Sequence, residues 1–125
     1  MNKSILLVDD DVLVLKTLKK LLETNQYSIE VAKNGNEAYE KFVAQKFDLV
    51  ICDIRMPGVN GIDFVKKLRE RDREKNRVTP VIFITGYADE RAPIEANKLA
   101  AVDYILKPFD IDQLVGSVTN VLKGC

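Results

Sequence analysis

Histidine is absent from this chain of 125 residues. Its absence excludes catalysis by an imidazole, the common zinc sites that need histidine, and a role as a phosphohistidine carrier. Lysine and arginine together number 19, as do aspartate and glutamate, so neither charge is in excess. This balance gives no reason to expect direct binding to nucleic acid or to an anionic membrane.

Cysteine and long hydrophobic runs are also scarce. The two cysteines are Cys52, within a predicted strand, and Cys125, the last residue, and no C-x-x-C spacing occurs. We interpret Cys52 as a small core residue and expect no disulfide. No apolar run approaches the roughly 20 residues of a membrane span, and MNKSILLVDDD lacks a signal-peptide cleavage site. These absences predict a cytoplasmic protein without a membrane partner.

Short apolar runs alternate with amphipathic stretches along the whole chain. Near-continuous apolar strands between such helices indicate a parallel sheet covered on both faces. The length suits a single domain spanning 1–125. We therefore predict an α/β, doubly wound parallel sheet with five helices and five strands, at 4–8, 28–31, 49–53, 81–85 and 103–106. The charged run KKLRERDREKNR, 66–77, is interpreted as a solvated helix end and turn, with a docking patch as the alternative.

Polar residues stand where four of the predicted strands end. Asp9 and Asp53 carry carboxylates, Thr85 a hydroxyl and Lys107 an ammonium group. The carboxyl ends of parallel strands share one edge of the sheet, where ligands bind. These four groups are therefore expected to lie together.

Three consecutive acids, Asp9, Asp10 and Asp11, follow the first strand. Clustered carboxylates repel one another, and a hard divalent cation removes that cost. Magnesium prefers a few carboxylates together with waters and phosphate oxygens. An acidic helix N-cap explains one of the three acids, but it does not explain why Asp53 comes to the same edge. Together the acids predict a magnesium site.

An aspartate carboxylate can attack phosphorus and form an acyl phosphate. This transfer needs positioning and stabilisation of charge on the phosphoryl oxygens. Asp10 with magnesium, the ammonium of Lys107, and Thr85 with the Gly86 amide match these requirements. The sequence therefore favours phosphorylation of an aspartate.

The motifs ILLVDDD, CDIRMPGVNG, VIFITGYAD and DYILKPF stand in the order and spacing of a known family. The chain resembles the receiver domain of two-component response regulators over essentially its full length. This resemblance implies the flavodoxin-like strand order 2-1-3-4-5 and identifies Asp53 as the phosphoacceptor. It implies that Asp10 and Asp53 bind Mg²⁺, with Asp9 acting through water and the Arg55 backbone carbonyl completing the protein ligands.

Other roles also follow from the resemblance. Thr85 and Lys107 would contact the phosphoryl group, with the Gly86 backbone beside it. Tyr104 falls at the aromatic switch position, and the Lys107–Pro108 bond matches the family's cis peptide. A sensor histidine kinase or phosphotransfer protein would be the phosphate donor. The identity of that donor, the output domain or downstream protein, and a phosphorylation-dependent homodimer all stay open.

Two places depart from the commonest pattern of the family. Leu99-Ala100-Ala101 stands where many members have glycine, and alanine is strained in the left-handed cap that glycine permits, so a different helix end is expected. Pro93 falls within the expected fourth helix. Proline suits a first helical position, so we predict that this helix starts near Pro93 and that 86–92 form a mobile loop.

Three other functions are alternatives to a phosphorylated switch. A phosphatase of the haloacid dehalogenase type needs an acid two residues after its nucleophile, where this chain has Arg55. A flavodoxin-like electron carrier must bind a flavin phosphate, which Asp9–Asp11 would repel, and an absorbance spectrum would test for flavin. A receiver that only docks would not need the complete set of pocket residues found here.

Overall fold

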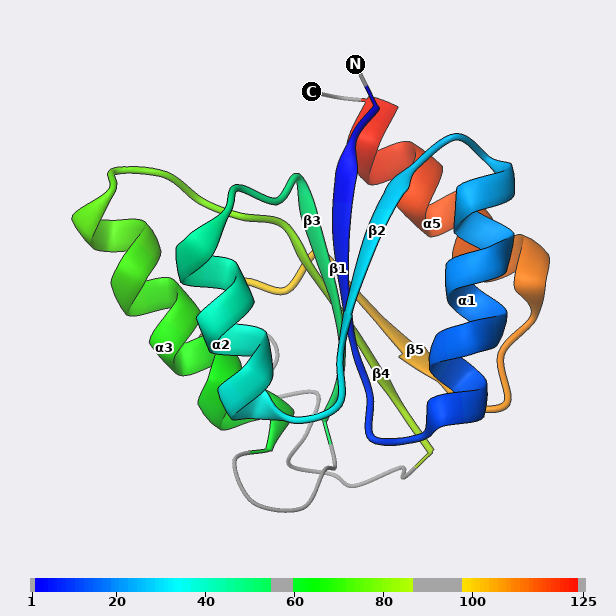
Figure 1. Ribbon diagram of the computed structural model, residues 1–125, viewed down its shortest axis with the longest axis horizontal. Helices are drawn as coiled ribbons and strands as arrows, with labels where there is room; N and C mark the ends of the chain where they lie inside the picture. The colour runs from blue at the N-terminus through cyan, green and yellow to red at the C-terminus, as the bar shows by residue number, and fades with distance from the viewer. Residues whose placement is uncertain (1, 55–59, 87–97, 124–125) are drawn as a thin grey trace.

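The computed structural model describes residues 2–54, 60–86 and 98–123. Its five strands are all parallel and form one sheet in the order β2-β1-β3-β4-β5 (Figure 1). This confirms the predicted fold and strand order. The strands are β1 (Ser4–Val8), β2 (Ser28–Ala32), β3 (Leu49–Asp53), β4 (Val81–Thr85) and β5 (Asp103–Leu106).

Helices cover both faces of the sheet, with α1 and α5 on one face and α2 and α3 on the other (Figure 1). The described residues contain four of the five predicted helices, and the fourth in sequence falls mostly on residues 87–97, outside the described ranges. None of these helices is long and apolar enough to cross a membrane. Their bounds are α1 (Val12–Thr24), α2 (Gly35–Ala44), α3 (Gly61–Glu74) and α5 (Ile111–Lys123).

Alternating strand residues pack into two separate cores. Leu6, Val50 and Phe83 face α2 and α3, whereas Leu7 and Ile51 face α1 and α5. This alternation follows from the two-residue period of a strand, and burial on both faces explains why the sequence shows continuous apolar runs. Each strand is thereby packed within the protein, and its polar end comes at the edge of the sheet.

A side chain caps the start of each of the helices α1, α2 and α3. Asp11 accepts hydrogen bonds from the Leu13 and Val14 amides at the start of α1. Asn34 caps α2, and Asn60 caps α3. Such caps satisfy amides that have no partner within the helix. Asp11 is therefore the one acid of the three that the capping interpretation explains.

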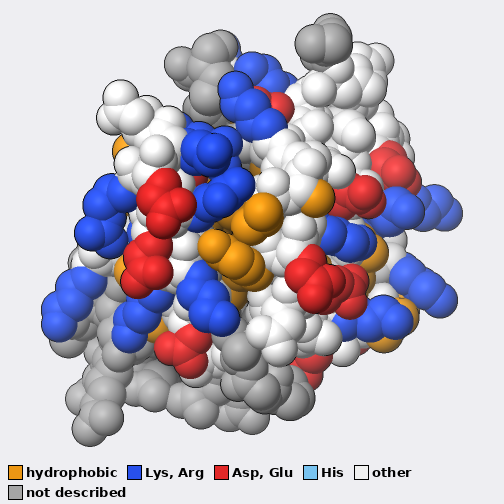
Figure 2. Space-filling model, turned by 60° about the vertical axis from the view of Figure 1, so that its left-hand side comes forward, with side chains coloured by type: hydrophobic (Ala, Val, Ile, Leu, Met, Phe, Trp, Pro, Cys, Tyr) orange, Lys and Arg blue, Asp and Glu red, His pale blue; other side chains and the backbone are white. Residues whose placement is uncertain are grey.

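The charged run 66–77 is only partly solvated, which corrects the prediction. It forms the end of α3 and a turn, but Asp72 is buried and Arg69 is partly buried. The outer face of α2 and α3 carries many charged side chains with a few hydrophobic ones among them (Figure 2). Val43 is exposed on this face, and the Lys67 ammonium lies over the Tyr39 ring.

Ala100 adopts the left-handed conformation, with φ of 59°. The expectation that alanine would change this turn is therefore wrong at residue 100. The left-handed conformation costs alanine about 1–2 kcal/mol, so contacts with neighbouring residues must stabilise it. The related prediction for Pro93 and the loop 86–92 falls mostly outside the described residues.

Candidate functional site

The polar groups predicted to meet do so at the carboxyl edge of the sheet. β1 is followed at once by Asp9, β3 ends in Asp53 and β4 ends in Thr85. The pairing of β4 with β5 places Leu106 opposite Thr85, so Lys107 follows directly beside them. Because β1, β3, β4 and β5 are adjacent and parallel, their ends converge on one small region.

Three carboxylates form a compact cluster there. One oxygen from each of Asp9, Asp10 and Asp53 lies within 4.8 Å of the others. Asp9 and Asp53 are buried and Asp10 is exposed, so the cluster opens to solvent on one side. Hard cations such as Mg²⁺ prefer oxygen ligands of this type together with water. The arrangement could therefore hold a metal ion.

The Lys107 ammonium lies among these acids. Its Nζ donates to Asp9 Oδ2 at 2.7 Å and to Asp53 Oδ2 at 3.1 Å. Burial alone would lower the pKa of Lys107, but the hydrogen bond from Nζ to Asp9 and the charges of Asp53 and Asp9 together raise it above its ordinary value. The group is therefore a permanent positive charge at neutral pH, and it offsets part of the repulsion between the carboxylates.

Backbone contacts fix Lys107 relative to Thr85. The Lys107 N–H donates to the Thr85 carbonyl at 2.7 Å. The Lys107–Pro108 peptide bond is cis. Gly86 follows Thr85 in an open position, where even an added Cβ would lie 4.0 Å from the Lys107 Cβ. Lys107 Nζ therefore lies beside Asp53, and Thr85 and Gly86 are held next to the backbone of Lys107.

Tyr104 lies two residues before the strand end, opposite Phe83 in β4. Phe83 and Thr85 share one face of the sheet, because side chains alternate along a strand. Tyr104 is half-buried and packs against the core on that same face of the sheet, the face that α2 and α3 cover. The structure therefore places Tyr104 and Thr85 on one face.

Gly61 is a site residue whose role the sequence did not reveal. A Cβ at this position would lie 2.1 Å from the Asp53 carbonyl oxygen and 2.9 Å from Cys52 Sγ. The Gly61 N–H donates to the Ile54 carbonyl at 2.9 Å. The start of α3 is thus pressed against the backbone that carries Asp53, which only glycine permits. Its position eight residues after Asp53 gave no signal of this contact.

Cys52 is fully buried beside the acid cluster, as the prediction of a core residue requires. Its Sγ donates to the Asp53 carbonyl at 3.3 Å. Burial, followed by the charges of Asp53 and Asp9, raises the pKa of the Cys52 thiol well above its usual range. The thiol is therefore a structural group and not a nucleophile. Arg55, the predicted carbonyl ligand, lies outside the described residues.

A family model for the response regulator receiver domain matches residues 5–119. The chain belongs to this family. Receiver domains are the signalling modules of two-component response regulators, so the fold and the acid cluster described above occur in a signalling domain.

Among curated relatives, this receiver chain is 38% identical to the transcriptional regulatory protein CrdR of Helicobacter pylori, over 91% of this chain and 52% of CrdR. It is 36% identical to the transcriptional regulatory protein ZraR of Escherichia coli K12, over 97% of this chain and 26% of ZraR. The chain therefore spans about half or a quarter of the length of these relatives.

Solved receiver structures agree closely with the fold. The chemotaxis protein CheY4 of Vibrio cholerae superposes with a TM-score of 0.89 at 29% identity, covering 98% of this chain and 100% of that one. The response regulator TrrA of Thermotoga maritima superposes with a TM-score of 0.84 at 35% identity, covering 96% and 99%. The TrrA structure is a complex with Mg²⁺ and BeF.

Proposed function

We propose that residues 1–125 are a single receiver domain in which Asp53 accepts a phosphoryl group. The observation that carries this proposal is the contact of Lys107 Nζ with both Asp9 and Asp53 at an edge that also holds Asp10. An ammonium group beside the acceptor carboxylate can stabilise charge on an incoming phosphoryl group. No second function has a comparable observation in its favour.

In the proposed reaction, a carboxylate oxygen of Asp53 attacks phosphorus and the bond from phosphorus to the donor nitrogen breaks. The product is an acyl phosphate, and the leaving nitrogen takes up a proton. Lys107 would turn toward one phosphoryl oxygen, while the Thr85 hydroxyl and the Gly86 amide would bind another. Such preorganised donors lower the barrier because phosphoryl transfer is mainly a problem of positioning and charge.

Magnesium is the cation that we propose for the acid cluster. Asp9, Asp10 and Asp53 would hold it, with the Arg55 carbonyl as a further ligand from outside the described residues. When bound, it would neutralise the carboxylates and the phosphoryl oxygens. The complex of the relative TrrA with Mg²⁺ and BeF supports this choice of ion.

No histidine among these 125 residues can carry the phosphate, so the donor histidine lies outside them. We propose that a sensor histidine kinase or a phosphotransfer protein supplies phosphohistidine. The domain would catalyse only its own phosphorylation and dephosphorylation. We also propose that it works in the cytoplasm, a reducing compartment in which the buried Cys52 thiol stays free.

Phosphorylation would act as a switch through Thr85 and Tyr104. A phosphoryl group on Asp53 would draw the Thr85 hydroxyl toward it and change the space available to Tyr104 on the same face of the sheet. The change in population is limited by how much better the phosphoryl group interacts with one conformation than with the other. An output domain or a separate protein would read the changed face.

Labelling with acetyl phosphate or phosphoramidate in the presence of Mg²⁺ tests the acceptor. Mass spectrometry should show one added phosphate on the wild type and none on Asp53→Asn. Asp48→Asn is the matched control, because Asp48 directly precedes β3 and accepts a hydrogen bond from the Ser4 amide that asparagine can also accept. It should be labelled as the wild type is. A full phosphate adduct on Asp53→Asn would overturn the assignment.

A further inference from the structure

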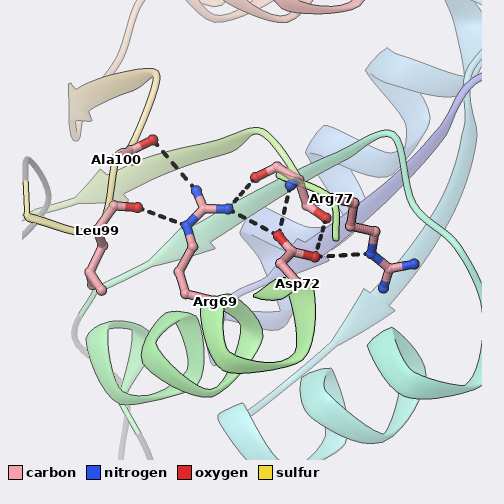
Figure 3. A network of polar contacts seen from close by, with 6 residues as sticks. Arg69, Asp72, Arg77, Leu99 and Ala100 are labelled. Atoms are coloured by element: carbon pink, nitrogen blue, oxygen red, sulfur yellow. Dashed lines mark hydrogen bonds and ion pairs between the residues drawn. The ribbon is translucent and has the colours of Figure 1, made fainter. Parts of the chain in front are cut away.

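Figure 3 shows a buried polar network. It lies where β4 and β5 begin, at the end of the sheet opposite the acid cluster. Its centre is Asp72 of α3, which is 2% exposed. Asp72 Oδ2 accepts from the Thr79 amide at 2.7 Å and from Arg69 at 3.2 Å. Its Oδ1 accepts from the Thr79 hydroxyl at 2.9 Å and from Arg77 Nε at 3.0 Å. A buried carboxylate of this kind is stable only because both oxygens are fully hydrogen-bonded.

Arg69 extends this network to a segment 30 residues away. Its Nε donates to the Leu99 carbonyl at 2.8 Å, and a terminal nitrogen contacts the Ala100 carbonyl at 3.5 Å (Figure 3). Another nitrogen of the same guanidinium donates to the Thr79 carbonyl at 2.6 Å. Only the rigid, five-donor fork of arginine can make all these bonds at once. Arg69 thus joins α3, Thr79 two residues before β4, and the turn before β5.

The turn that Arg69 holds contains the left-handed Ala100. The carbonyls on the two residues Leu99 and Ala100 would otherwise be left at a helix end without helical partners. Glycine usually occupies such a position, because alanine is strained there. The two bonds to the guanidinium are formed in this conformation and so favour it over an unstrained alternative.

This turn leads directly into β5. The Val102 amide donates to the Val81 carbonyl at 2.9 Å, which starts the pairing of β5 with β4. β5 is only four residues long and lies at the edge of the sheet. The residue after it is Lys107, which contacts Asp9 and Asp53. A displacement at the start of so short a strand would be carried to the lysine.

We propose that Arg69 is a positioning residue that replaces glycine's role at the turn: it holds Ala100 in the left-handed conformation and thereby sets β5 so that Lys107 reaches the acid cluster. The part that concerns Lys107 rests on the proposed function. The part that concerns the turn does not, and it can be tested without phosphate.

The test compares Arg69→Met in two backgrounds, with Ala100 and with Ala100→Gly. Methionine keeps much of the aliphatic length of the side chain and removes the guanidinium. In the Ala100 background, amide exchange at Val102 should become about tenfold faster, and the change should be larger than at Val50, whose amide donates to the Pro80 carbonyl. Labelling of Asp53 by acetyl phosphate should be slower. In the glycine background both effects of Arg69→Met should be smaller.

Arg77→Met is the matched control. Arg77 contacts the same carboxylate, but its guanidinium lies over the Phe42 ring at 5.2 Å, on the side of α2. Its loss should not accelerate Val102 exchange more than Val50 exchange. If Arg69→Met unfolds the chain, Arg69→Lys keeps the charge beside Asp72 without the fork and serves in its place.

The proposal is overturned if exchange at Val102 and Val50 rises equally, if Ala100→Gly gives no rescue, or if Arg77→Met has the same effect as Arg69→Met. Unchanged labelling of Asp53 despite selective exchange at Val102 would overturn the link to Lys107. Absence of labelling in the wild type would count against the proposed function instead, since the exchange measurements use the unphosphorylated protein.

Discussion

At the scale of single residues, three consecutive acids differ in their surroundings. Asp9 is buried and binds Lys107, Asp10 is exposed within the cluster, and Asp11 caps α1. The three residues form the connection between β1 and α1, in which each has different surroundings. The sequence predicted one cap among the three but could not identify Asp11, because the choice depends on where the helix starts.

Gly61 gives a prediction at the same scale. Gly61→Ala should lower the free energy of unfolding by roughly 1–3 kcal/mol or more, because the new Cβ would lie 2.1 Å from the Asp53 carbonyl oxygen. Neither the strand nor the helix backbone can yield without moving the other. Urea unfolding would measure the loss, and labelling by acetyl phosphate should also slow because Asp53 is displaced.

Gly116 is the matched control for this substitution. It lies in α5, and a Cβ there would meet nothing within 4 Å. Gly116→Ala should therefore raise the free energy of unfolding by about 0.5–1 kcal/mol, through the better helix propensity of alanine. Equal effects of the two substitutions would show that the close approach at Gly61 has no energetic importance.

At the scale of helices and strands, prediction from sequence succeeded where burial leaves a continuous apolar run. β1, β3, β4 and β5 have the predicted bounds, and β2 extends one residue further, to Ala32. Their four polar ends were predicted to meet, and Asp9, Asp53, Thr85 and Lys107 do converge on one edge of the sheet.

Prediction failed where burial depends on contacts between distant segments. Asp72 stands in a run of charged residues and has no local sign of burial. It is buried because Thr79 and two arginines complete its hydrogen bonds after the chain has turned into β4. Ala100 likewise keeps the left-handed turn through Arg69, which lies 31 residues earlier. The sequence immediately around Asp72 or Ala100 therefore predicts neither the burial of the first nor the conformation of the second.

The helix expected before β5 gives a prediction at this scale. Pro93 has no N–H and disfavours a helical Ala92, so we expect the helix to start near Pro93. Amides of residues 86–92 should then exchange fast in the unphosphorylated protein and more slowly with Mg²⁺ and beryllium fluoride bound. The buried amides of β4 are the internal reference. A protected helix running from Asp89 through Pro93 without phosphate would contradict the prediction.

At the scale of the whole molecule, folding concentrates like charges at one edge of a chain with no net charge. The carboxylates of Asp9, Asp10 and Asp53 come together only in the folded state, and Lys107 offsets only part of their repulsion. A cation that binds this cluster therefore binds the folded chain in preference to the unfolded one. Binding of Mg²⁺ must then stabilise the entire fold.

Thermal unfolding with and without Mg²⁺ measures this coupling. At 100 times its dissociation constant, Mg²⁺ should add about 2.7 kcal/mol, which for a chain of this size raises the Tm by roughly 8–15 °C. Asp10→Asn should lose most of this gain, although without Mg²⁺ its Tm should not fall, because a repulsive charge has been removed. Lys107→Ala should retain the gain, since the ammonium competes with the cation for the same carboxylates.

Asp11→Asn separates metal binding from a general effect of charge. It removes the same charge one residue away from Asp10, and asparagine caps a helix as well as aspartate does. Because Asp11 is used to cap α1, this variant should keep nearly the whole rise in Tm. If Asp10→Asn responded to Mg²⁺ as the wild type does, the carboxylates of the cluster would not be the metal ligands. If Asp11→Asn lost the response equally, Mg²⁺ would be attracted by the total negative charge of this edge of the sheet and would not bind at a defined site.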